Sequence, residues 1–122
     1  SMTIKREIGD FGEDFACKKL KRLGMTVLER NFSAACGEID IIAKKDDILA
    51  FIEVKTRTEG FLYEPIYAVT RQKQQKIIRT AQCYLMKNPL ELQPRFDVFE
   101  VILKAGTKHR VQEYHYIENA FW

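Results

Sequence analysis

Two apolar segments of the sequence lie so close together that they are predicted to pair as an antiparallel β-hairpin. The first runs from Glu38 to Ala43 and the second from Leu49 to Lys55, and both have the period-two character of strands. The polar residues 44–47 between them predict the turn of the hairpin. Because a strand pair needs an apolar partner to cover it, we expect helices to pack on the sheet that contains this hairpin.

Two amphipathic helices and three further strands surround the hairpin in the sequence. Residues 8–23 carry apolar side chains at helical spacing and end at Gly24, and a second stripe follows Thr70 and ends near Asn88 and Pro89. Strands are predicted over residues 26–31, 95–104 and 110–117. The resulting order αβββαββ predicts a three-layer α/β fold, with a mixed central sheet of about five strands flanked by helices.

The composition excludes several classes of protein. The 122 residues are 46% hydrophobic and 30% charged, as in an ordinary globular protein, and residues 2–122 are expected to form a single domain. The longest apolar run, residues 48–52, is too short to cross a bilayer, so no membrane is expected as a partner. Cys17, Cys36 and Cys83 form no CxxC pair, which predicts reduced thiols in a cytoplasmic protein, with Cys17 and Cys83 buried.

Charged residues interrupt the apolar hairpin, where strands are usually poor in them. Asp40 lies in the first strand, and Glu53 and Lys55 lie two residues apart in the second, on one face. A loop of residues 45–46 or 44–47 would place Asp40 opposite Phe51 and diagonal to Glu53, on that same face. A three- or five-residue loop without a bulge would place Asp40 on the other face.

Two carboxylates and a lysine on one face suit metal-dependent phosphodiester hydrolysis. Carboxylate oxygens favour Mg²⁺ or Mn²⁺ over zinc, and such a cation activates water and polarises a phosphoryl oxygen. A lysine adds positive charge where the transition state becomes negative. The structural alternative is an ion pair between Glu53 and Lys55 on an exposed face of the sheet.

Basic residues are concentrated near the second predicted helix. The net charge of +3 predicts no partner by itself, but residues 65–90 contain five basic side chains and no acidic one. Phosphates bind well at helix N-termini and basic surfaces, whereas the alternative is a solvated helix face. The candidate nucleic-acid-binding residues at the start of this helix are Arg71, Lys73, Gln74 and Lys76.

The hairpin motifs resemble the signature of the YraN-like family, which belongs to the restriction-endonuclease-like PD-(D/E)XK superfamily. The matching segments are residues 37–43, with the sequence GEIDIIA, and residues 51–57, with the sequence FIEVKTR. The resemblance covers nearly the whole chain, although Ile39 stands where the superfamily name has its proline. Further matches are Gly9, Gly12-Glu13, Ala16, Arg30-Asn31 and Arg95-Phe96-Asp97-Val98.

This resemblance implies a restriction-endonuclease-like core and a metal-dependent DNA endonuclease or resolvase. Asp40 and Glu53 would bind Mg²⁺ or Mn²⁺, with the Val54 carbonyl also facing the metal, and Lys55 would be the catalytic lysine. Glu13 matches the helix glutamate that completes the site of the similar archaeal Holliday-junction resolvases. DNA, including branched DNA, would be the substrate, and a homodimer would suit cutting of two strands. The alternative is a nucleic-acid-binding module with a nuclease fold and little or no catalysis.

Overall fold

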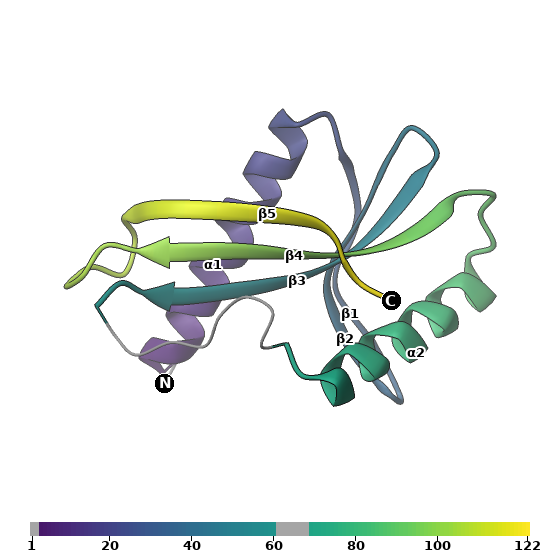
Figure 1. Cartoon of the computed structure of the whole chain (residues 1–122), viewed down its shortest axis with the longest axis horizontal. Helices are drawn as coiled ribbons and strands as arrows, with labels where there is room; N and C mark the ends of the chain where they lie inside the picture. The colour runs from purple at the N-terminus through teal and green to yellow at the C-terminus, as the bar shows by residue number, and fades with distance from the viewer. Residues whose placement is uncertain (1–2, 61–68) are drawn as a thin grey trace.

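A computed structural model describes residues 3–60 and 69–122, and these residues form two helices and a five-stranded sheet in the order αβββαββ (Figure 1). This arrangement confirms the predicted α/β class. The prediction that residues 2–122 form one domain includes residues 2 and 61–68, which lie outside the described residues. The elements are α1 (Ile4–Arg22), β1 (Thr26–Ala34), β2 (Gly37–Lys45), β3 (Ile48–Thr58), α2 (Arg71–Lys87), β4 (Gln93–Leu103) and β5 (Val111–Phe121).

Local capping residues set the helix ends. Helix α1 begins one turn before the predicted start at Ile8, because Arg6 N donates to the side chain of Thr3 at 3.2 Å. That first turn is mostly exposed, so it carries no apolar stripe to predict it. Helix α2 begins after Thr70 as predicted, where the hydroxyl accepts from Lys73 N at 3.1 Å.

Neither helix in the described part of the chain has the length and apolar character that a membrane span needs.

The five strands stand in the sheet in their sequence order, β1-β2-β3-β4-β5. Neighbours pair antiparallel except β3 and β4, which run parallel because the chain crosses over through α2 between them. Strand β1 extends to Ala34 rather than residue 31, and β5 reaches Phe121 rather than residue 117. The sheet is therefore mixed, as predicted, with longer edge strands than the sequence pattern indicates.

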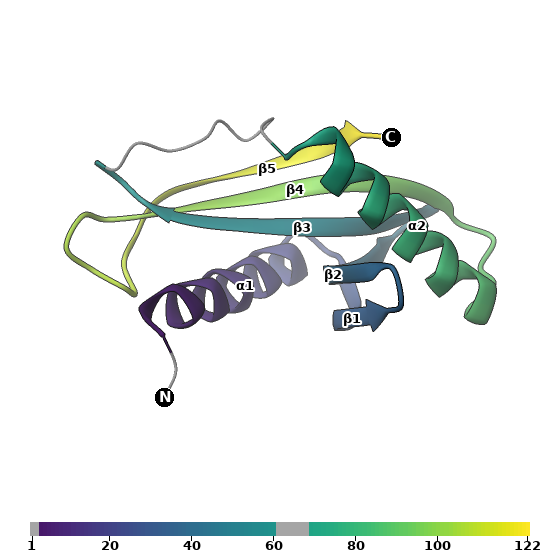
Figure 2. The same ribbon diagram turned by 90° about the horizontal axis from the view of Figure 1, so that it is seen from below.

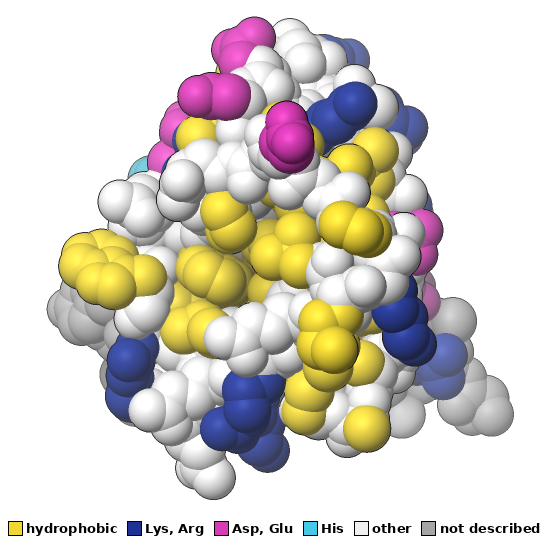
Figure 3. Space-filling model, turned by 90° about the vertical axis from the view of Figure 1, so that its right-hand side faces the viewer, with side chains coloured by type: hydrophobic (Ala, Val, Ile, Leu, Met, Phe, Trp, Pro, Cys, Tyr) yellow, Lys and Arg dark blue, Asp and Glu magenta, His cyan; other side chains and the backbone are white. Residues whose placement is uncertain are grey.

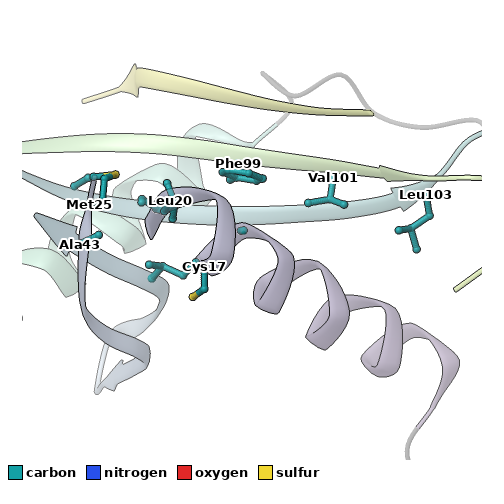
Figure 4. Packing of buried hydrophobic residues seen from close by; sticks show 11 residues of the cluster. Cys17, Leu20, Met25, Ala43, Phe99, Val101 and Leu103 are labelled. Atoms are coloured by element: carbon teal, nitrogen blue, oxygen red, sulfur yellow. The ribbon is translucent and has the colours of Figure 1, made fainter. Parts of the chain in front are cut away.

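Alternate residues of β3 pack against different helices, which makes the fold three-layered (Figure 2). Ala50 and Ile52 lie in a hydrophobic cluster with α1, while Leu49 and Phe51 lie in a second cluster with α2. We call these the α1-side and α2-side clusters. Figure 4 shows the α1-side cluster, where Leu20 of α1 faces the strands. All of these side chains are completely buried, so β3 is the centre of both halves of the core.

Strand β2 does not keep the same alternation along its length. Ile41 belongs to the α1-side cluster, whereas Ile39, two residues earlier, belongs to the α2-side cluster. The neighbouring strand β1 contains a left-handed residue, Asn31, with φ of 53°. Such a residue turns the strand locally, and Asp40 lies at the point where β2 passes from one cluster to the other.

Apolar side chains also gather on the end of the molecule at the right of Figure 1 (Figure 3). Helix α2 leads into β4 at this end, and Met86 and Leu90 near that junction are exposed. Basic side chains border the lower part of this surface, and both acidic and basic side chains border its upper part in Figure 3. Charged groups therefore surround the hydrophobic surface rather than cover it.

Candidate functional site

The turn of the β2–β3 hairpin fixes where the acidic residues stand. Asp46 and Asp47 form a two-residue turn, with Asp46 at a left-handed φ of 54°, and Lys45 pairs with Ile48. The predicted register, with Asp40 opposite Phe51, is therefore wrong, because Phe51 faces Ile42. The register moves by two residues, which keeps each side chain on its predicted face.

Asp40 and Glu53 line the same cleft between the hairpin and α2, which has a volume of about 220 Å³. Strand β2 supplies one wall, β3 the floor at Glu53, and the first two turns of α2 the opposite wall. We call it the β2–α2 cleft. Its lining residues are Gly37, Glu38, Asp40, Glu53, Lys73, Lys76 and Ile77.

The Asp40 carboxyl is held by the backbone and destabilised as an anion. Val54 N donates a hydrogen bond to Asp40 Oδ2 at 2.7 Å, which orients the carboxyl group across the hairpin. Burial, and then the negative charge of Glu53, raise the pKa of Asp40 to about 7, against the lowering effect of the Val54 hydrogen bond. A cation in the cleft would relieve this repulsion.

Glu53 already has a cationic partner, the ammonium group of Lys73 on α2. Lys73 Nζ lies 2.7 Å from Glu53 Oε1, and the Glu53 side chain is only 9% exposed. Burial lowers the pKa of Lys73, but the hydrogen bond and the charge of Glu53 outweigh it and raise the pKa overall. Lys55 is half-buried on β3, and its side chain is close enough to Lys73 to influence that pKa as well.

Glu13 of α1 contacts β1, outside the β2–α2 cleft. It is buried, and its Oε1 accepts from Arg30 Nε at 3.3 Å and from Asn31 Nδ2 at 2.9 Å. Burial raises the pKa of Glu13, while Arg30 opposes that effect. The charge of Glu13 also contributes to the raised pKa of Asp40, so these two carboxyls are electrostatic neighbours.

Arg30 and Asn31 thus have a role that the sequence motif containing them does not predict. Both adjacent side chains bind Glu13, which regular strand alternation would prevent. The left-handed backbone of Asn31 accounts for this arrangement. An Asn in an otherwise strand-like segment is the signal that could have predicted it, because Asn tolerates this conformation.

The four predicted nucleic-acid-binding residues have different surroundings. Lys73 and Lys76 line the β2–α2 cleft. Arg71 instead donates to the Trp122 carbonyl at 2.7 Å, and Gln74 Nε2 donates to the Val69 carbonyl at 2.8 Å. The structure therefore brings the two lysines to the acidic residues and engages Arg71 and Gln74 in contacts at the start of α2.

The donor set of the cleft determines which metal it could hold. Within residues 3–60 and 69–122, no three His, Cys, Asp or Glu side chains lie together as a metal-binding cluster. Asp40 and Glu53 provide two carboxylates, and Mg²⁺ typically uses one or two carboxylates while keeping several waters. The residues present therefore fit a hydrated Mg²⁺ or Mn²⁺ ion, and they do not fit zinc.

Comparisons with known proteins agree with one another. The model of the family described as "Uncharacterised protein family UPF0102" matches residues 12–101. A UPF0102 protein from Clostridium botulinum (strain Loch Maree / Type A3) is 47% identical over 119 residues, which cover 95% of this chain and 94% of the relative. A UPF0102 protein from Dictyoglomus turgidum is 43% identical over 117 residues, covering 95% of this chain and 98% of the relative.

Proposed function

This chain belongs to the UPF0102 family, and we propose that it is a metal-dependent DNA endonuclease with its active site in the β2–α2 cleft. One observation carries the proposal: the carboxyls of Asp40 and Glu53 share this cleft, and the pKa of Asp40 is about 7. Two carboxyl groups that repel each other in a cleft destabilise the fold unless a cation binds them, and strongly shifted pKa values are concentrated at functional sites. The mixed sheet with a helix on each face is consistent with a restriction-endonuclease-like core.

In this proposal Asp40 and Glu53 hold Mg²⁺ or Mn²⁺ together with water. The bound metal supplies an activated water and polarises the phosphoryl oxygen. The Val54 N–H holds Asp40 Oδ2 in place and leaves Asp40 Oδ1 available as a ligand. Lys73 competes with the metal for Glu53, because its Nζ lies 2.7 Å from Glu53 Oε1.

The lysines around the cleft act on the phosphodiester. Lys55, on the strand that carries Glu53, places its positive charge near the phosphate and so stabilises the negative charge that develops there in the transition state. Lys73 and Lys76, which line the cleft from the start of α2, bind the neighbouring phosphates. Recognition by these groups is directed at the backbone, because phosphate contacts carry no direct sequence information.

Branched DNA is the proposed substrate class, cut by a homodimer in the cytoplasm. Resemblance to the archaeal Holliday-junction resolvases supports this part of the proposal. Glu13 would then complete the site from α1, and its influence on the pKa of Asp40 supports an electrostatic role. Glu13 would act through charge in this arrangement, since Arg30 and Asn31 hold its Oε1.

The test is Mg²⁺- or Mn²⁺-dependent cleavage of a Holliday junction, a flap and a plain duplex, with DNA binding measured in parallel. Lys55→Ala should slow cleavage by about 10²–10³-fold while metal binding persists, since it removes one transition-state donor. Asp40→Asn should lose metal affinity and cleavage together. Lys44→Ala is the matched control, because Lys44 is an exposed lysine of the same hairpin.

Three outcomes of this test have distinct meanings. Cleavage at the same rate in wild type, Lys55→Ala and Asp40→Asn would identify a contaminating nuclease and refute the site. Salt-dependent DNA binding without cleavage of any of the three substrates would favour the nucleic-acid-binding module. Binding that is absent at low salt would exclude both functions.

A further inference from the structure

Two cysteines from distant parts of the sequence meet beside the β2–α2 cleft. Cys36 lies in the turn between β1 and β2, and Cys83 lies in α2. Their Sγ atoms are 3.7 Å apart, and both residues are half-buried. The third cysteine, Cys17, is buried in the α1-side cluster. The expectation that Cys83 is a buried core residue is therefore wrong, because it faces Cys36 instead of the core.

The surroundings favour Cys36 as the more reactive thiol. Its Sγ lies 3.6 Å from Thr80 Oγ1, and the hydrogen bonds with Thr80 and then Cys83 lower the pKa of Cys36, with a smaller contribution from the charge of Arg79. The hydrogen bond with Cys36 raises the pKa of Cys83. The Thr80 hydroxyl also donates to the Lys76 carbonyl at 2.7 Å, so it must rotate toward sulfur when Cys36 ionises.

The backbone holds the turn directly against α2. Gly37, next to Cys36, has a φ of 152°, and a Cβ added there would lie 3.1 Å from Thr80 Oγ1 and 3.9 Å from the Lys76 carbonyl oxygen. This close approach keeps the two thiols near each other. A disulfide needs an S–S distance of about 2.0 Å, so the two Sγ atoms, now 3.7 Å apart, must approach each other by about 1.7 Å.

We propose that Cys36 and Cys83 are a reversible redox pair that forms an intramolecular disulfide when the protein meets a hydroperoxide. The Cys36 thiolate attacks the hydroperoxide, forming an S–O bond as the O–O bond breaks, and the leaving oxygen takes a proton to become an alcohol or water. The Cys83 sulfur then attacks the Cys36 sulfenic acid, forming the S–S bond as water leaves with the Cys83 proton. Two thiols are oxidised and one hydroperoxide is reduced.

The disulfide would join the β1–β2 turn to α2 beside the lysines of the cleft. Gly37, Lys73 and Lys76 all line that cleft, so oxidation would fix the distance between its two walls. The cross-link also closes a long loop of the chain, which should raise Tm by roughly 10 °C. This inference does not depend on nuclease activity, since both the bond and its effect on Tm are measured without DNA.

The experiment uses the full chain, reduced and then treated with one equivalent of hydrogen peroxide at low protein concentration. Wild type and the control Cys17→Ser should each lose two thiols and two hydrogens in mass, and peptide mapping should show the bond between Cys36 and Cys83. Dithiothreitol should restore both thiols. Cys83→Ser should stop at a sulfenic acid on Cys36 that dimedone traps, and Cys36→Ser should give no intramolecular disulfide.

Several results would overturn the redox pair. They are retention of all three thiols after peroxide, a disulfide that contains Cys17, and cross-linking only between molecules. A Cys83→Ser protein without a dimedone adduct on Cys36 would also overturn the assigned order of attack. Thermal melts of each reduced variant establish that it is folded, and titration of wild type against glutathione measures the same disulfide without any substitution.

Discussion

Replacement of Asp40 by Asn tests whether the ionised Asp40 carboxylate destabilises the folded protein. Burial raises the folded-state pKa of Asp40 from its ordinary value of 3.8 to about 7, so the folded protein holds this proton more tightly than the unfolded chain does. The contribution of protonated Asp40 to the free energy of unfolding is therefore fully present below pH 3.8 and is lost as the pH rises through about 7. Asn carries no charge at any of these pH values and can still accept the Val54 hydrogen bond.

The expected size of the effect follows from the two pKa values. Each pKa unit corresponds to about 1.4 kcal/mol, so the difference between 3.8 and about 7 sets an upper limit of about 4 kcal/mol. Asp40→Asn should therefore be more stable than wild type at pH 8.5 by up to this amount. At pH 4.5 the two proteins should differ by less than about 1 kcal/mol.

Urea unfolding at pH 4.5 and pH 8.5 measures these free energies, with Glu38→Gln as the control. Glu38 is an exposed carboxyl two residues earlier in the same strand, so its replacement should change stability little at either pH. Mn²⁺ should stabilise wild type at pH 8.5 and leave Asp40→Asn unchanged. An Asp40→Asn protein that is no more stable than wild type at pH 8.5 would refute the argument.

Three further predictions concern the packing of α1 and the roles of Lys73 and Lys55. Gly12→Ala should destabilise the fold by about 1–3 kcal/mol in chemical denaturation, because its Cβ would lie 1.8 Å from Thr56 Oγ1. The control Gly9→Ala should be neutral or stabilising, since nothing lies within 4 Å of the added Cβ. Equal losses of stability at both glycines would contradict the close approach of α1 to β3. Lys73→Met should strengthen Mn²⁺ binding by up to about fivefold in calorimetry, since it removes a partly exposed competing cation; weaker binding would contradict that competition. Lys55→Ala should leave Mn²⁺ affinity within about twofold of wild type while cleavage falls by about 10²–10³-fold, and parallel loss of both would make Lys55 part of the metal site instead.

Most of the fold follows from apolar periodicity, because α1 and α2 each bury one face and the strands β2, β3 and β4 supply most of the buried sheet residues. Both ends of α2 follow from the sequence, since Thr70 caps its start and Pro89 comes just after its last turn. The hairpin register does not, because the turn could be closed by several pairs of polar residues. The left-handed conformation of Asp46 selects residues 46–47 for the turn, and no periodicity in the sequence encodes that choice.

The candidate site was predictable only within the hairpin. Asp40 and Glu53 are close in sequence, and a strand residue changes face only when the register moves by an odd number of residues. The register moves by two residues, so both side chains lie on the predicted face although the predicted pairing is wrong. The contact between Lys73 and Glu53 depends on how α2 docks after the crossover, which no local pattern specifies. The meeting of Cys36 with Cys83 has the same origin, since their sequence spacing carries no disulfide motif.

The parallel pairing of β3 with β4 has a consequence for the order in which the chain folds. The β2–β3 hairpin closes through two residues, whereas β3 meets β4 only after a long excursion through α2 that brings Ile48 to Gln93. Short loops close with a smaller loss of entropy than long ones, and non-local pairing slows folding. We therefore expect the β2–β3 hairpin to form early in folding and α2 to dock on it late. Asp40 and Glu53 would then be close together before Lys73 reaches Glu53.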